Sequence, residues 1–334
     1  MGRDLVKKIV IGTAIALAAS APLLGQEKKP SPPVAKVEKQ IVLEDKKTRD
    51  PFVPPKNIRY LAKQSEIIIN SLDDLAHRLK KDGFDKKQIL AAYDDERFKI
   101  HPHIANYFVF NPEEQTPTYE EYKKHIGLNR KIKAGVMFFE RYSLDLLLAE
   151  DYHGVEASIG AAILGVESDF GQNLGQFRAF NAAVSLYSSP RKEFAYRQLK
   201  SLLNLSKENN LDFMEVFSSY ALCAFPGQFL LENIPVFFVG GNGDPKGDLF
   251  SMVDWIYSID NYLEKAGWDH RQNYKPIKKG SANWKAIWAY NHSEYYVWAI
   301  IELASAIRDN PEVKIRRDHH EEFKKMGKIL VDIW

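Results

Sequence analysis

A glutamate stands at the end of an apolar helical pattern, in a position that suits acid–base chemistry. Apolar residues recur at helical spacing from Val155 to Val166, and Glu167 follows directly. Gly171 and Gly175 come next, and glycines at such places let the chain reverse its direction. The dipole at the C-terminal end of a helix disfavours a negative charge, and partial burial acts in the same direction. We therefore expect the pKa of Glu167 to be raised, as a general acid near neutral pH requires.

The alternative is that Glu167 lies in water at a frayed helix end, as most glutamates do. Where a reaction uses two carboxylates on either side of the bond that breaks, they lie about 5–10 Å apart. Asp169 is two residues away and would point in another direction on a helix. Glu156 lies about 16 Å away along a helix that rises 1.5 Å per residue. A single-carboxylate reaction therefore fits the segment, while a second acid from a distant part of the chain stays open.

Residues 1–25 have the pattern of a secretory signal peptide. Arg3, Lys7 and Lys8 form a basic start, and an apolar run follows over residues 9–19. That run is shorter than the roughly 20 residues that span a membrane, although an uncleaved anchor stays an alternative. No cysteine follows the run, so we do not expect a lipoprotein. We expect an exported protein of the periplasm or the cell envelope.

The remaining chain divides by composition. Residues 26–56 are rich in lysine and proline, cannot bury much apolar surface, and are expected to form a linker. We expect one catalytic domain over residues 57–310 and a charged helical tail over residues 311–334. Strand-like alternation is nearly absent, so we expect a mainly α protein with at most a small β-sheet. Helices are expected over residues 67–79, 130–148, 194–205 and 253–266, with further helices that begin after Asp85 and Thr118.

Composition excludes several other classes of protein. The 334 residues are 45% hydrophobic, which is enough for a sizeable core, and the net charge of +2 gives no reason to expect nucleic acid. The one cysteine, Cys223, rules out an intramolecular disulfide and a thiolate metal cluster. His101 and His103 have no further ligands near them in the sequence. We therefore expect no metal site built from these residues.

Two motifs carry a resemblance to a known family. Gly165-Val-Glu-Ser-Asp-Phe-Gly171, followed by Asn181-Ala-Ala-Val-Ser-Leu186, resembles the catalytic segment of the lytic murein transglycosylase B family, glycoside hydrolase family 103. The resemblance extends from about Phe84 to Ala306. It implies a lysozyme-like transglycosylase core with additional helices.

The resemblance also implies a reaction on peptidoglycan. In that family a single glutamic acid protonates the oxygen between N-acetylmuramic acid and N-acetylglucosamine. The same group then removes the proton from the C6 hydroxyl of the muramyl sugar, which closes a 1,6-anhydro ring. Because the attacking group belongs to the substrate, no water has to be activated. By resemblance, Glu167 is the residue in this role.

Further motifs in the family order imply a set of substrate-binding residues. Aromatic rings give sugar faces an apolar platform, while Ser, Asn and Gln hydrogen-bond their substituents. The alternative for each tyrosine is packing in the core. The set consists of Tyr122, Ser219, Gln228, Tyr262, Tyr290, Asn291 and Tyr296.

The chain departs from the family at two places. Leu222-Cys-Ala-Phe225 stands where the family has Gly-Ala-Met-Gly, so both glycines are replaced by bulky residues. The calcium-binding turn of the family is represented by Val239-Gly-Gly-Asn-Gly-Asp244, which lacks two oxygen ligands, so we expect at most weak calcium binding. The altered loop leaves a second hypothesis open, a non-catalytic wall-binding or scaffold protein. A third is a lysozyme-like hydrolase.

The expected partners are peptidoglycan glycan strands and, beyond these, proteins of the cell-wall machinery, and the protein is expected to be a monomer. Endo- or exo-action is left undecided by the sequence.

Overall fold

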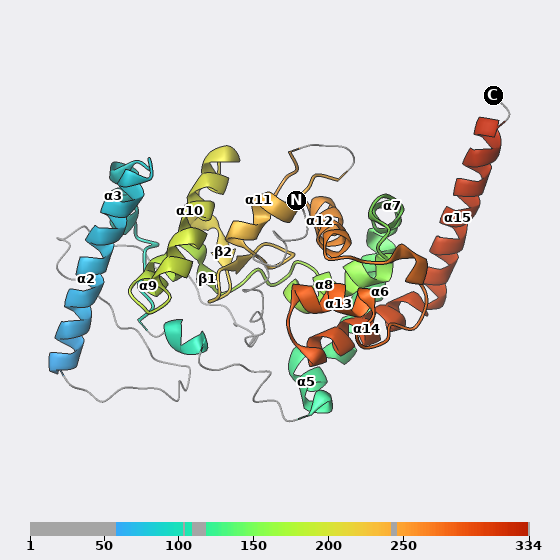
Figure 1. Cartoon of the computed structure of the whole chain (residues 1–334), viewed down its shortest axis with the longest axis horizontal. Helices are drawn as coiled ribbons and strands as arrows, with labels where there is room; N and C mark the ends of the chain where they lie inside the picture. The colour runs from blue at the N-terminus through green and yellow to red at the C-terminus, as the bar shows by residue number, and fades with distance from the viewer. Residues whose placement is uncertain (1–57, 103, 109–117, 242–245, 333–334) are drawn as a thin grey trace, which may run out of the picture. The chain divides into compact units, whose positions relative to one another are not determined.

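The computed structural model describes residues 58–102, 104–108, 118–241 and 246–332. Within these ranges the chain is mainly helical and carries a four-stranded sheet of very short strands, which confirms the expected fold class (Figure 1). The expected signal peptide and linker lie outside the described residues. None of the described helices is long and apolar enough to cross a membrane.

The chain forms two compact units. In the described part, one unit consists of the chain up to Ala105 together with Phe180–Glu215. Its rings cluster in the core, where Tyr93, Phe98 and Phe213 pack around Phe180. Its elements are α2 (Ile58–Lys81), α3 (Lys86–Tyr93), most of α9 (Ala179–Tyr187), α10 (Lys192–Glu208) and η3 (Phe213–Glu215).

The other unit consists of Asn106–Ala179 and the chain from Val216 onward. Its helices before the sheet are α5 (Tyr119–Ile126), α6 (Leu128–Arg141), α7 (Ser143–His153) and α8 (Ala157–Ser168). Those after the sheet are α11 (Ile234–Phe237), α12 (Met252–Lys265), α13 (Ala282–Tyr290), α14 (Glu294–Arg308) and α15 (Pro311–Asp332). Its short 3₁₀ turns are η4 (Leu231–Asn233), η5 (His270–Gln272) and the part of η2 (Ile104–Phe108) from Asn106 onward.

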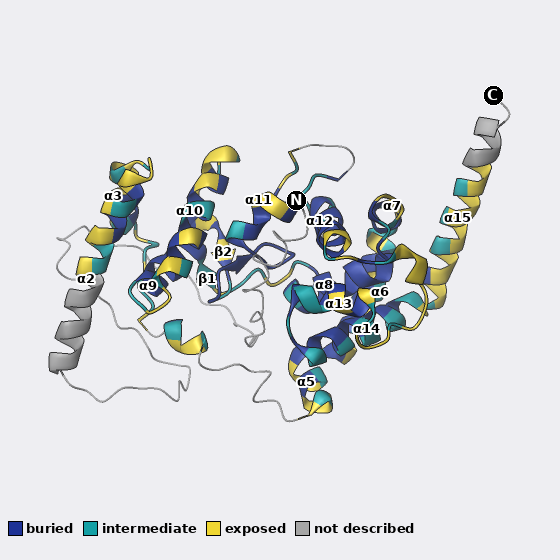
Figure 2. Cartoon of the chain, in the orientation of Figure 1, coloured by how far each residue is buried: buried dark blue, intermediate teal, exposed yellow. Residues whose placement is uncertain are grey.

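Helix α8 forms the centre of this second unit. It packs against α14, α6, α7 and α12, and Figure 2 shows it in the colour of buried residues. Glu167 is the one residue of α8 that is not buried. Small residues let the neighbours approach, since a Cβ on Gly165 would lie 2.5 Å from Phe170 and one on Gly160 would lie 2.7 Å from Asp260. A helix this apolar is stable only inside a core, and it therefore supplies a rigid base for Glu167.

The sheet brings two distant segments together. Its strands are β1 (Phe177–Arg178), β2 (Phe217–Ser218), β3 (Cys223–Ala224) and β4 (Phe229–Leu230), paired antiparallel in the order β1-β2-β3-β4. Phe177 pairs with Ser218, so the chain that leaves α8 lies beside the strand that leads into the 219–228 loop. Both segments reach the site described below.

Most expected helix ends are confirmed, and one helix is wrong. Asp85 and Thr118 cap their helices through side-chain oxygens, and α2 and α12 end just before glycines with positive φ. Residues 130–148, however, do not form a single helix. Tyr142, with φ −113° and ψ 27°, ends α6 and starts α7. The amphipathic pattern continues across this break, so periodicity alone could not reveal it.

Candidate active site

Glu167 projects from the last turn of α8 and is half-buried. The hydroxyl of Tyr296 donates a hydrogen bond of 2.7 Å to Oε1 of Glu167. Tyr296 lies on α14 and is fully buried, so its ring is fixed by packing. The carboxylate is thus held from behind by a buried group rather than left at a frayed end.

The chain reverses sharply after Glu167. Asp169, Phe170 and Gly171 all have positive φ, at 54°, 59° and 84°. Oγ of Ser168 accepts the amide of Gly171 at 2.9 Å and so holds the turn. The expected reversal at Gly171 is therefore confirmed, although two residues that are not glycine share it.

Gly175 also turns the chain, with φ of 110°. A Cβ at this position would lie 2.1 Å from the carbonyl carbon of Ser218, so only glycine lets the two backbones approach this closely. The side chain of Asn173 accepts the Gly175 amide at 3.2 Å. The segment from 173 to 177 is thereby held against β2.

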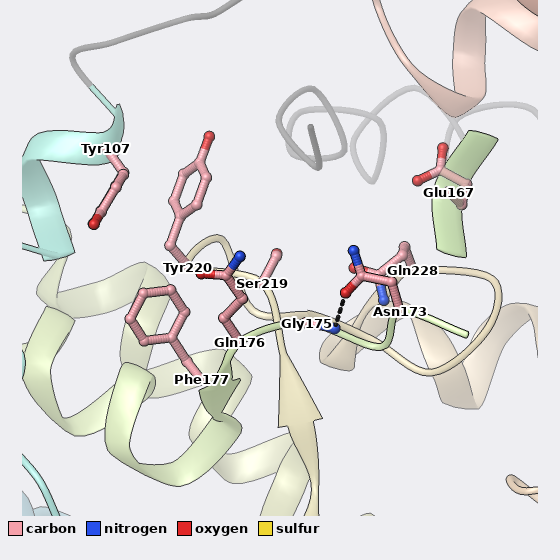
Figure 3. Close-up of a pocket in the computed structure, with 9 residues that line it drawn as sticks. All are labelled: Tyr107, Glu167, Asn173, Gly175, Gln176, Phe177, Ser219, Tyr220 and Gln228. Carbon is pink, nitrogen blue, oxygen red and sulfur yellow. Dashed lines mark hydrogen bonds between the residues drawn. The ribbon is translucent and has the colours of Figure 1, made fainter. Parts of the chain in front are cut away.

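A pocket opens beside Glu167. In Figure 3, Glu167 stands at one end and Tyr107 at the other, with Ser219 and Gln176 between them. Among the described residues that line this pocket, Glu167 is the one carboxylic acid. The lining consists of Tyr107, Glu167, Asn173, Gly175, Gln176, Phe177, Ser219, Tyr220 and Gln228.

Ser219 and Gln228, both predicted to bind substrate, lie in this pocket. Oγ of Ser219 accepts the amide of Cys223 at 3.2 Å, which orients the hydroxyl at the β2–β3 turn. Nε2 of Gln228 donates to the carbonyl of Phe225 at 2.9 Å. The structure thus brings both side chains to the same pocket as Glu167.

The altered loop keeps a backbone that glycine would adopt readily. Leu222 and Phe225 both have φ of 63°, and Gln228 has φ of 48°. Left-handed backbone costs a non-glycine residue roughly 1–2 kcal/mol. Both bulky side chains are buried, and Phe225 stacks on Trp255 with ring centroids 5.8 Å apart. The two bulky residues therefore adopt the left-handed backbone of the loop, with burial offsetting strain.

The other predicted binding residues do not line the pocket. Tyr262 donates to the carbonyl of Ala289 at 2.6 Å, and Tyr290 donates to the carbonyl of Gly227. Tyr122, Tyr262, Tyr290, Asn291 and Tyr296 are all at most 5% exposed. These contacts support packing roles for the tyrosines. A contact of these residues with a glycan stays a prediction.

Several residues of the pocket were missed by the sequence reasoning. Tyr107 and Tyr220 stack with centroids 5.2 Å apart, and Phe177 meets Tyr107 edge-on. Tyr107 is 44% exposed, so part of its ring is accessible. Asn173 and Gln176 add exposed amides. These residues come from η2, from the two-residue strand β1 and from loops, where no periodicity marks them. The family motifs on either side of Phe177 and Tyr220 were the available signal.

The two acidic residues nearest to Glu167 in the sequence, Asp169 and Glu156, are hydrogen-bonded to other residues. Burial alone would raise the pKa of Asp169, but the hydrogen bonds and charges of Arg130 and Lys131 lower it. Glu156, at the opposite end of α8, is 2% exposed and accepts from Ser158 and Arg308 and from the amide of Tyr274. Neither residue lines the pocket, so neither is placed as a second catalytic carboxylate.

The turn where the family binds calcium lies partly outside the described residues, because Asn242 and Asp244 fall there. Its base is closed by Asp254, whose carboxylate accepts the amides of Gly241 at 2.7 Å and Asp248 at 2.6 Å. Within the described ranges, no group of three His, Cys, Asp or Glu side chains could hold a metal ion. Weak calcium binding stays a prediction.

Comparison with known proteins connects this site to one family. The family described as transglycosylase SLT domain matches residues 69–279, more than half of the chain. Membrane-bound lytic murein transglycosylase B of Escherichia coli (strain K12) is 28% identical over 163 residues, which are 48% of this chain and 45% of that protein. The match thus spans less than half the length of this curated relative.

Solved structures show the same fold. The soluble lytic transglycosylase SltB1 of Pseudomonas aeruginosa matches with a TM-score of 0.62 at 23% identity, over 72% of this chain and 98% of that one. The Escherichia coli lytic transglycosylase Slt35, solved in complex with calcium, matches with a TM-score of 0.61 at 22% identity, over 72% and 92%. SltB3 of Pseudomonas aeruginosa, solved with NAG-NAM-pentapeptide, gives 0.60 at 19% identity, over 73% and 80%. The expected lysozyme-like transglycosylase fold is confirmed.

Proposed function

Since the chain belongs to the transglycosylase SLT family of lytic murein transglycosylases, we propose that it cleaves peptidoglycan glycan strands with Glu167 as acid and then base. The observation that carries this proposal is the single carboxylic acid among the described residues of the pocket. A two-carboxylate mechanism needs a second acid about 5–10 Å away across the bond. A one-carboxylate reaction needs only Glu167.

The proposed reaction conserves the proton of Glu167. Its carboxylic acid protonates the oxygen that links N-acetylmuramic acid to N-acetylglucosamine, and the bond from C1 to that oxygen breaks. The carboxylate then takes the proton of the C6 hydroxyl as O6 forms a new bond to C1. The products are a free N-acetylglucosamine end and a 1,6-anhydromuramyl end, and Glu167 is protonated again. The hydrogen bond that Tyr296 donates to Oε1 of Glu167 orients the carboxyl group for these proton transfers.

The remaining lining suits a glycan. Ser219, Gln228 and Asn173 offer hydroxyl and amide groups for N-acetyl substituents. Tyr107, at the far end from Glu167, offers part of a ring to a sugar face. We propose that the strand lies along this line, with the scissile bond at Glu167.

Product analysis tests the reaction type. Purified protein is incubated with glycan strands in water labelled with ¹⁸O, and the ends are measured by mass spectrometry. The expected products carry anhydromuramyl ends, lighter by one water and free of the label. Labelled reducing ends would instead indicate a lysozyme-like hydrolase. Strands that bind but are not cut would indicate a scaffold protein. Glu167→Gln, prepared in parallel, is the control for contaminating enzymes.

Export is proposed from the basic and apolar pattern of residues 1–25. N-terminal sequencing of the protein from its native cell should find a mature start within a few residues of Pro22 to Gln26. An intact Met1 with firm membrane association would instead indicate a retained anchor.

A further inference from the structure

A buried lysine lies behind the turn that carries Glu167. Lys131 belongs to the first turn of α6, and its side chain is only 6% exposed. Its Nζ donates to the carbonyl of Gly165 at 2.7 Å and to Oδ1 of Asp169 at 3.1 Å. Gly165 and Asp169 stand two residues before and two residues after Glu167. Lys131 therefore contacts the chain on both sides of Glu167, at the backbone of Gly165 and at the side chain of Asp169.

The backbone at this turn leaves one carbonyl, that of Gly165, without its usual helical donor. The amides of Asp169 and Phe170 both donate to the carbonyl of Leu164. In a continuing α-helix, the amide of Asp169 would instead bond to the carbonyl of Gly165. That carbonyl accepts from the ammonium of Lys131. A buried carbonyl without a donor is costly, and Lys131 supplies a donor to this one at the point where the helical pattern stops.

We propose that Lys131 is a positioning residue for Glu167, because its ammonium ties Gly165 to Asp169 and fixes the turn between them. The inference rests on the proposed function, since it gives Glu167 its catalytic role. Two successive non-glycine residues with positive φ, Asp169 and Phe170, persist only where the surroundings hold them. Lys131 from α6 supplies part of that hold. The ring of Phe170, which lies against Gly165, supplies another.

The same lysine places a positive charge in the surroundings of Glu167. Burial lowers the pKa of Lys131, while the carboxylates of Asp169 and Glu167 act against this fall. Further groups whose charge couples to Glu167 come from α12, α13, α14 and β3. They are Tyr262, Tyr290, Tyr296 and Cys223, each with a pKa raised first by burial. Of these groups, Lys131 is the one whose protonated form is positively charged.

Three variants separate the tether from the charge. Lys131→Met removes both the donor and the charge at similar length. Lys131→Gln removes the charge but keeps an amide that can donate to Gly165. Arg130→Met is the matched control, because Arg130 pairs with the same Asp169 carboxylate at 2.8 Å but is 61% exposed. Circular dichroism and melting establish that each full-length variant is folded.

Activity against pH is the first measurement. For Lys131→Met we expect kcat to fall about tenfold or more, because a displaced catalytic group loses effective molarity. The basic limb of its pH–rate profile should move to higher pH by about half a unit or more, since removal of a nearby cation favours the protonated form of Glu167. Lys131→Gln should show the same shift of the limb with a smaller loss of kcat. Arg130→Met should stay within about twofold of wild type, as expected of an exposed pair.

A second measurement does not depend on turnover. The ¹³C carboxyl signal of Glu167, identified by its absence in Glu167→Gln, is titrated in wild type and in the Lys131 variants. A higher midpoint in the variants supports the inference even if wild type cuts no glycan, in which case the proposed function alone has failed. The inference is overturned if Lys131→Met is folded and its kcat, the basic limb of its pH–rate profile and the titration midpoint of its Glu167 carboxyl signal all equal those of wild type. If Lys131→Met does not fold, the same comparison with Lys131→Gln decides.

Discussion

The two ends of α8 each carry a glutamate, and their surroundings differ in kind. Glu156 stands at the N-terminal end, is 2% exposed, and has its oxygens occupied by Ser158, Arg308 and the amide of Tyr274. The helix dipole favours a negative charge at this end. Glu167 stands at the C-terminal end, where the dipole disfavours a charge, and its carboxylate faces a pocket. The oxygens of Glu156 are taken up by partners inside the protein, whereas Glu167 lines a pocket.

The comparison predicts opposite outcomes for the same substitution at the two ends. Glu167→Gln should lower cleavage by about 10³-fold or more, since the amide can neither give nor take the proton. Its melting temperature should stay close to that of wild type. Turnover assays and thermal melts of the purified variant check both points. If the variant keeps near-normal turnover, Glu167 is not the acid.

Glu156→Gln should act on stability instead. The amide keeps the shape but removes the buried negative charge that pairs with Arg308, whose side chain is 22% exposed and whose Nε also lies 3.5 Å from Asp309. Loss of one partner from a buried pair should lower the free energy of unfolding by about 2–3 kcal/mol. Denaturant unfolding measures this, while the activity per folded molecule should remain near that of wild type. A catalytic loss as large as that of Glu167→Gln would remove the distinction between the two ends.

Loss of the hydrogen bond between Tyr296 and Glu167 should lower activity by a smaller amount. Tyr296→Phe removes a donor to the ionised form of Glu167, so the pKa of that carboxyl should rise and the basic limb should move to higher pH. We expect kcat to fall about tenfold, which corresponds to roughly 1.4 kcal/mol of barrier. A pH–rate profile measures both effects. A limb that moves toward lower pH would contradict this assignment of the hydrogen bond.

A third acid, Asp260, lies beside the middle of α8, and its substitution should have the smallest effect. Asp260 on α12 lies against Gly160, and within the described residues neither of its oxygens has a hydrogen-bond partner. Burial, followed by the charge of Glu150, raises its pKa well above the ordinary value. The folded state then binds its proton more tightly than the unfolded chain does, so stability falls as pH rises from about 4 toward the raised pKa.

Asp260→Asn tests this pH dependence. The asparagine carries no proton to lose, so the difference in unfolding free energy between the variant and wild type should grow in favour of the variant between about pH 4 and pH 7, by roughly 1 kcal/mol or more. Urea unfolding at several pH values measures the difference. A difference that stays constant with pH would mean that Asp260 is ionised in the folded protein or finds a partner.

The sequence predicted the fold class and the place where α8 ends beside Glu167, because both leave local marks. The apolar spacing of residues 155–166 predicts the helix, and Gly171 predicts its end. The roles of Lys131 and Tyr296 around Glu167 could not be predicted from local patterns. Lysines on amphipathic helices usually lie in water, and only the packing of α6 on α8 buries this one.

The pocket was only partly predictable for a similar reason. Ser219 and Gln228 were found through the order of family motifs. Tyr107 comes from η2 and Asn173 from an irregular segment, and neither belongs to a periodic element. Conversely, Tyr262 and Tyr290 match the family motifs, yet their hydroxyls donate to backbone carbonyls in the core. A motif gives the type of residue, while tertiary packing decides which surface it meets.

The positive φ values at Leu222, Phe225 and Gln228 have a consequence for folding kinetics. An unfolded chain seldom visits this conformation at three such residues, so the loop has no local tendency to form early. Its strain is offset only when Phe225 meets Trp255 and Leu222 is enclosed. Contacts made after the folding transition state act mainly on the unfolding rate. Substitutions in this loop should therefore change how long the native pocket persists rather than how fast the protein folds.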